Sequence, residues 1–305
     1  MLLVSDGTDV SRAEYRNVCD AALADKPRLS AVFEPTWRAS FWADVLAQPE
    51  AAAASGPVAY WLPMMGQLEP GLFPPKLHAG VEAGLEVLWP QMTPDDQREF
   101  AGRLRSHDPI AACDELLAAA GFATEFGHSA VRWPSAARGQ RKPEFFVECP
   151  TTRWAVESRF LQDNAQVRSL NAGMMESERG WIAHLEPNHD PTRMQRAIVK
   201  KITRKQGRGP IFIILTSYTP WLMPDSMQAV IRGILRDATS VGLRESELPV
   251  GVACLTWTIV QGIWFSDAAC AAASIDAALR DRIRRAIVSG FVSRSDGALL
   301  TEAGW

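Results

Sequence analysis

Two short stretches decide the fold of this chain: residues 142–147, which read KPEFFV, and residues 153–161, which read RWAVESRFL. Successive side chains of a β-strand point to opposite faces, so Glu157 and Arg159 share a face, with Cα atoms about 7 Å apart. Glu144 precedes Glu157 by thirteen residues, which is a suitable spacing for two strands of one hairpin. The sequence therefore predicts a hairpin that brings the carboxylates of Glu144 and Glu157 together.

Strand and helix patterns alternate around this hairpin. A helix is expected at residues 110–120, ending at Gly121, because glycine is common just past a helix end. Strands are expected at 122–126, 145–149, 153–161 and 181–185, a helix at 192–206, a hairpin at 250–260 and 262–265, and a closing helix at 275–289. The continuous apolar run at 211–217 is typical of a central strand buried on both faces. We predict an α/β (α+β) fold, a mixed central sheet flanked by helices, over residues 109–305, after a helical region at 1–108.

The order of acidic residues within these elements resembles the PD-(D/E)XK nuclease superfamily, which has the restriction-endonuclease-like fold. Pro143-Glu144, twelve intervening residues, and then Glu157-Ser158-Arg159 match its signature. Glu115 lies in the helix before the first strand, where these nucleases often carry another glutamate. Residues 198–206, IVKKITRKQ, are similar to the helix that borders the site in several branches. The resemblance covers about a third of the chain.

The resemblance implies a metal-dependent phosphodiesterase that acts on nucleic acid, with DNA as the default substrate. Glu144 and Glu157 would hold Mg²⁺ or Mn²⁺ through hard oxygen ligands. Glu115 would help as a ligand or through a water, and Arg159 would replace the superfamily's catalytic lysine. Two departures favour an alternative, a catalytically inactive nuclease-like fold that binds nucleic acid or protein. Glu144 stands where aspartate is usual, and arginine, unlike lysine, is never a proton donor at neutral pH.

A basic stripe follows the hairpin. Between Pro191 and Pro210 the chain has seven basic residues and no acidic ones. A one-signed helix face of this kind suits contact with a phosphate backbone, although such stripes also occur as solvated faces. The residues expected to bind nucleic acid are Arg196, Lys200, Arg204, Lys205, Gln206 and Arg208.

Composition narrows the remaining classes of function. The net charge of −3 argues against a globally basic nucleic-acid binder but allows a local basic groove. Five scattered cysteines without a CxxC pair favour a reducing cytoplasm over a disulfide framework or a zinc site. No apolar run is long enough to span a membrane, so no membrane partner is expected. A third alternative is a protein–protein component that uses the tryptophan-rich helical region. The sequence leaves the oligomeric state open.

Overall fold

The computed structural model of the chain describes residues 2–3, 9–10, 16–17, 20–21, 23–47, 77–106, 109–135, 142–160, 209–217, 233, 243–256 and 259–291. The chain divides into two compact units. The first comprises Met1–Cys113 with Asp163–Glu186, and the second comprises Asp114–Gln162 with Pro187–Trp305. Across the described ranges, no helix has the length and apolar character needed to cross a bilayer.

The first unit is mainly helical. Its helices are α2 (Pro27–Val32), α3 (Pro35–Ala47), α6 (Leu77–Leu88), the 3₁₀ turn η1 (Trp89–Gln91) and α7 (Pro94–Leu104). Two short strands, β1 (Leu2–Leu3) and β2 (Asp9–Val10), pair antiparallel.

At two helix starts in this unit, side chains accept hydrogen bonds from backbone N–H groups that have no partner within the helix. Thr93 caps α7 by accepting a hydrogen bond from the Asp96 N–H. Glu82 of α6 is 8% exposed and accepts the N–H groups of Arg28 and Leu29 at 2.8 and 2.7 Å. Because these amides belong to the first turn of α2, the buried carboxylate ties α2 to α6.

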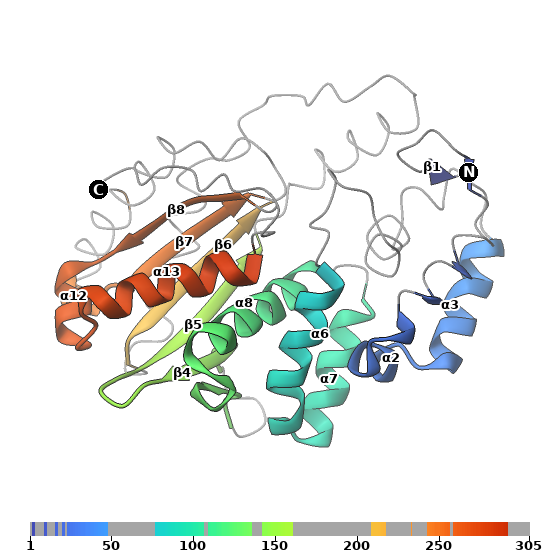
Figure 1. The fold of residues 1–305 in the computed structure, drawn as a ribbon, viewed down its shortest axis with the longest axis horizontal. Helices are drawn as coiled ribbons and strands as arrows, with labels where there is room; N and C mark the ends of the chain where they lie inside the picture. Colours follow the sequence, from blue (N-terminus) through green and yellow to red (C-terminus); the bar gives the residue numbers. More distant parts are fainter. Residues whose placement is uncertain are drawn as a thin grey trace. The chain divides into compact units, whose positions relative to one another are not determined.

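The second unit is built on a six-stranded mixed sheet (Figure 1). Its spatial order follows the chain: β3 (Val131–Arg132), β4 (Phe145–Glu148), β5 (Arg153–Phe160), β6 (Ile211–Ser217), β7 (Gly251–Thr256) and β8 (Ile259–Phe265). β3, β4 and β5 are antiparallel neighbours, β5, β6 and β7 run parallel, and β8 returns antiparallel to β7. The predicted α/β class is confirmed. In β6, Ile213 and Ile214 point to opposite faces and both are 0% exposed, which confirms the expected burial on two sides.

Helices α8 (Ile110–Phe126) and α13 (Ala277–Phe291) lie side by side on one face of this sheet (Figure 1). Phe122 of α8 packs edge-on against Phe145, Trp154 and Phe212, with ring centroids 5.9, 6.5 and 6.4 Å away. These three rings come from β4, β5 and β6, and they mark the face that α8 covers. The short helix α12 (Asp267–Ala272) and the 3₁₀ turn η3 (Glu245–Glu247) complete the described elements.

The prediction that the helix ends at Gly121 and a strand follows at 122–126 is wrong. Helix α8 continues through Gly121 to Phe126, and the chain turns at Gly127, whose φ is +91°. Gly121 instead allows a close helix crossing. A Cβ atom at Gly121 would lie 2.1 Å from the Ala286 carbonyl oxygen, and one at Gly290 would lie 2.4 Å from the Leu117 carbonyl oxygen.

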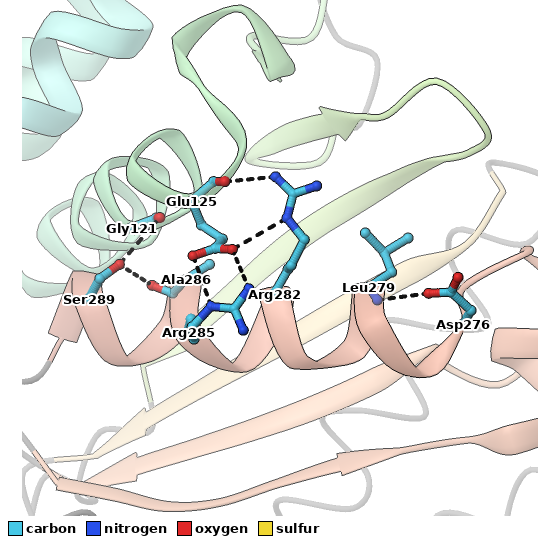
Figure 2. Close-up of polar contacts among 8 residues, drawn as sticks. All are labelled: Gly121, Glu125, Asp276, Leu279, Arg282, Arg285, Ala286 and Ser289. Carbon is cyan, nitrogen blue, oxygen red and sulfur yellow. Dashed lines mark hydrogen bonds and ion pairs between the residues drawn. The ribbon is translucent and has the colours of Figure 1, made fainter.

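Polar contacts fix the same crossing (Figure 2). The Ser289 hydroxyl of α13 donates to the Gly121 and Ala286 carbonyls at 3.4 and 3.1 Å. One turn further along α8, Glu125 forms ion pairs with Arg282 and Arg285 at 3.3 and 2.7 Å. The hydrogen bond from Arg285 is the largest influence on Glu125, and with the charge of Arg282 it holds the pKa of this carboxyl below its ordinary value.

Candidate active site

The two predicted metal ligands lie in one hairpin, with Glu157 on β5 and Glu144 immediately before β4. The register of β4 and β5 places Phe145 opposite Val156 and Phe146 opposite Ala155. Continued by one position, this register places Glu144 opposite Glu157. Directly opposite residues of an antiparallel pair point to the same face, with Cβ atoms about 4.5–5.5 Å apart. The hairpin itself agrees with the thirteen-residue spacing, and the pairing of the two carboxylates as metal ligands stays a prediction.

Glu157 is buried, whereas Glu144 is half-buried. The side chain of Glu157 is 1% exposed, and the residue lies opposite Ile213 in the ladder between β5 and β6. One oxygen of each carboxylate, Oε2 of Glu144 and Oε1 of Glu157, is inaccessible to solvent. Carboxylate oxygens are the donors that Mg²⁺ prefers, and this ion is usually held by one or two carboxylates together with waters and substrate phosphates. The carboxylates of the half-buried Glu144 and the buried Glu157 are therefore of the donor type that suits Mg²⁺ or Mn²⁺.

Arg159 supplies positive charge on the face that carries the pair. It lies two residues beyond Glu157 on β5, opposite Leu215 of β6, and its side chain is exposed. Two strand residues span about 7 Å, so a guanidinium on this flexible stem reaches the region beside Glu157. Because the side chain is exposed, its N–H groups are accessible to an anion.

Glu115 is also buried, at 0% exposure, but it lies on a different element. It precedes Phe122 by seven residues, so both project from the same side of α8, the side that packs on Trp154. Trp154 and Glu157 are an odd number of positions apart on β5, so they point to opposite faces. Among the described residues, no three or more His, Cys, Asp or Glu side chains group closely enough to hold a metal ion. The role of Glu115 in the site stays a prediction.

Polar residues that the sequence interpretation missed lie near Glu115. Thr216 of β6 donates a hydrogen bond to Asp114 Oδ2, and both side chains are buried, at 6% and 7% exposure. Ser158 of β5 is 8% exposed and shares their face of the sheet. The sequence contains a signal for both residues. Thr216 is a polar residue in the otherwise apolar stretch 211–216, and Ser158, next to Glu157 on the strand, is a polar residue on the opposite face.

A second missed group lies on the face that carries the carboxylate pair. Glu148 of β4 contacts Arg153 of β5 at 3.3 Å and Arg132 of β3 at 3.6 Å. The guanidinium of Arg153 also stacks on the Phe146 ring, 3.8 Å from its centroid. Strand alternation would have found this group, since Phe146 and Glu148 follow Glu144 at even spacing.

The predicted nucleic-acid-binding stripe lies outside the described residues. This applies to the whole set: Arg196, Lys200, Arg204, Lys205, Gln206 and Arg208. The same holds for the expected strand at 181–185 and helix at 192–206. Their roles stay predictions.

No protein-family model, curated protein or solved structure matches the chain. The geometry of the hairpin, together with the resemblance in its sequence, is therefore the basis for a functional proposal.

Proposed function

We propose that this chain is a metal-dependent phosphodiesterase of the PD-(D/E)XK type that cleaves nucleic acid, with DNA as the first substrate to test. The observation that supports the proposal is the register of β4 and β5, which would set Glu144 opposite Glu157 when continued one position beyond Phe145. Carboxylates at directly opposite positions of a hairpin supply hard oxygen ligands that one divalent cation could share.

The order of elements supports the proposal. Helix α8 precedes three antiparallel strands, β3, β4 and β5. Pro143-Glu144 leads into the second of these strands, and Glu157-Ser158-Arg159 lies in the third. The buried strand β6 then pairs parallel with the third. The strands at 145–149, 153–161 and 211–217 from which the resemblance was drawn correspond to β4, β5 and β6.

Each residue of the site has a separate task. Glu144 and Glu157 would hold Mg²⁺, which when bound lowers the pKa of a coordinated water and offsets the charge of the phosphate. Arg159 would donate hydrogen bonds to phosphate oxygens and so orient the phosphodiester beside the carboxylates. The burial of Glu157 lowers the dielectric around its carboxylate, which would strengthen the attraction between this carboxylate and a bound cation.

A second candidate function is nucleic-acid binding without cleavage. Arg159 is the observation that favours it, because arginine keeps the charge of the superfamily's lysine but not its compact ammonium or its readiness to transfer a proton. A chain of this kind would retain affinity for nucleic acid in the presence of Mg²⁺ and leave the phosphodiester bonds intact.

A cleavage assay tests the proposal. Labelled DNA and RNA, single- and double-stranded, are incubated with the full chain and Mg²⁺ or Mn²⁺, with a chelator as blank. We expect metal-dependent cleavage that falls by about a hundredfold or more in Glu144→Gln and Glu157→Gln. The matched control is Asp267→Asn, a carboxylate on α12 whose side chain is 90% exposed. Cleavage that is equal in wild type and Glu157→Gln would refute the proposal, and metal-independent binding without cleavage would favour the second candidate.

A further inference from the structure

Two arginines lie on the same face of the sheet as Glu144 and Glu157, at the other end of the hairpin. Arg153 begins β5, and Arg132 of β3 lies opposite Phe146 of β4 in the ladder. Phe146 lies opposite Ala155 and therefore points to the same face of the sheet. Glu157 follows Ala155 by two residues on β5, so it shares this face as well. The arginines and Glu157 therefore lie on one face of the sheet, with the buried Ala155 between Arg153 and Glu157 on β5.

The two guanidinium groups are held in place but remain exposed to solvent. Both contact Glu148 through Nε, the inner nitrogen, at 3.3 Å for Arg153 and 3.6 Å for Arg132. Their side chains are nevertheless 53% and 49% exposed. Two positive charges share one carboxylate, so the group keeps a net charge of about +1, and the outer guanidinium nitrogens are the donors that a phosphate contact uses.

The stacking of Arg153 on Phe146 fixes the direction of that charge. A guanidinium 3.8 Å from a ring centroid has a favourable cation–π interaction. An arginine held on a ring and by an ion pair has already lost much of its rotamer freedom. It therefore loses less entropy on binding a ligand than a free surface arginine does.

We propose that Arg132 and Arg153 form a second anchor for the phosphate backbone of the substrate, several nucleotides from the bond that is cleaved. Arg153 precedes Glu157 by four strand residues, or about 13 Å. At the B-form rise of about 3.4 Å per nucleotide, this distance corresponds to about four nucleotides of one strand. The anchor rests on the proposed function, and it specifies the substrate as a polynucleotide that continues past the cleaved bond rather than a small phosphodiester.

The chain contains a matched control for this anchor. Arg284 of α13 lies over the Phe265 ring at 5.0 Å and pairs with Asp281 at 2.6 Å, and its side chain is 44% exposed. It is an arginine held by a ring and a carboxylate, as Arg153 is. However, α13 lies on the face of the sheet opposite to Glu157. The charge of Arg284 is also balanced by its own carboxylate partner, Asp281. Arg284→Gln therefore removes the same chemistry away from the proposed substrate path.

The test measures binding and turnover separately. Binding of a labelled oligonucleotide duplex is titrated over a range of salt in the Glu157→Gln background, where cleavage does not interfere. Arg153→Gln should weaken binding about tenfold at low salt and reduce the salt slope by about one. Arg153→Lys keeps the charge and should retain most of the slope, whereas Arg284→Gln should match its parent. Thermal melts of each variant identify losses that come from unfolding.

Turnover is compared on DNA and on bis(p-nitrophenyl) phosphate, a diester without a neighbouring phosphate. With Glu157 intact, Arg153→Gln should lower kcat/KM for DNA about tenfold and leave that for the small diester unchanged. Equal DNA binding and equal DNA turnover in Arg153→Gln and wild type would overturn the anchor while the proposed function stands. Conversely, absence of Glu157-dependent turnover on both substrates would refute the proposed function, and the salt titration would still decide whether Arg153 contacts phosphate. A folded wild type without affinity for DNA or RNA at low salt would overturn both.

Discussion

Substitution of Gly121 by alanine tests the crossing of α8 and α13 on which the second unit depends. The added Cβ would lie 2.1 Å from the Ala286 carbonyl oxygen and 2.8 Å from the Gly290 backbone nitrogen. Both neighbours are backbone atoms, so no side-chain rotation relieves the clash. Ordinary contact begins near 3.4 Å, and the two helices would have to move apart by about 1 Å to reach it.

The size of the effect follows from two opposing terms. Overpacking of a well-packed contact costs about 1–3 kcal/mol, and a clash with backbone belongs at the upper end of that range. Alanine in a helix interior returns about 1 kcal/mol relative to glycine. The free energy of unfolding should therefore fall by about 2 kcal/mol, which lowers Tm by about 4–8 °C for a unit of this size.

Gly102 provides a control with the opposite sign. It lies on α7, and no atom lies within 4 Å of the Cβ it would gain. Gly102→Ala should therefore raise stability by about 0.5–1 kcal/mol through helix propensity alone. Both variants are measured by calorimetric melting, with circular dichroism to confirm helix content. If Gly121→Ala is as stable as Gly102→Ala, the close crossing described here is incorrect.

Two further predictions concern charged groups. The hydrogen bond from Arg285 is the main reason why the pKa of Glu125 is lowered in the folded state. The ionised carboxylate of Glu125 therefore stabilises the fold fully above the unfolded pKa of about 4.5, and this stabilisation is lost as pH falls through the lower folded pKa. Glu125→Gln should therefore reduce the loss of Tm between about pH 5 and pH 3, and an unchanged acid limb would contradict this. Arg159→Lys should preserve or raise cleavage, whereas Arg159→Ala should lower it about a hundredfold. Unchanged cleavage in Arg159→Ala, with melts run in parallel, would remove Arg159 from the site.

The parts of the fold that sequence predicts are those where pattern and burial coincide. The strand at 211–217 appears as β6 with the same bounds, because the large apolar residues at 211–215 fit a strand buried on two faces. The hairpin of β4 and β5 also follows the prediction, since alternation fixes both its faces and its register.

The errors arose where tertiary contacts decide local structure. Glycine is permissive both at a helix end and in a tight helix crossing, and only the presence of α13 against Gly121 distinguishes the two. With α8 extended to Phe126, the first strand moved to Val131–Arg132, a two-residue strand too short for a periodic signal. The antiparallel pairing of β4 with β5 was predictable from spacing. Spacing could not predict which side of the sheet α8 covers. Helix α8 lies on the Trp154 side, so Glu115 is separated from the face that carries Glu157.

Binding of divalent metal at the facing carboxylates tests the central claim most directly. Mg²⁺ and Mn²⁺ are titrated calorimetrically into wild type, Glu144→Gln, Glu157→Gln and the control Asp267→Asn. The facing positions of Glu144 and Glu157 predict one saturable site in wild type and in the control, and its loss in both glutamate variants. Metal should raise the Tm of wild type and leave that of Glu157→Gln unchanged, because only a ligand bound to the folded state stabilises it. Equal binding heats in wild type and Glu157→Gln would contradict the assignment of this pair as the metal site.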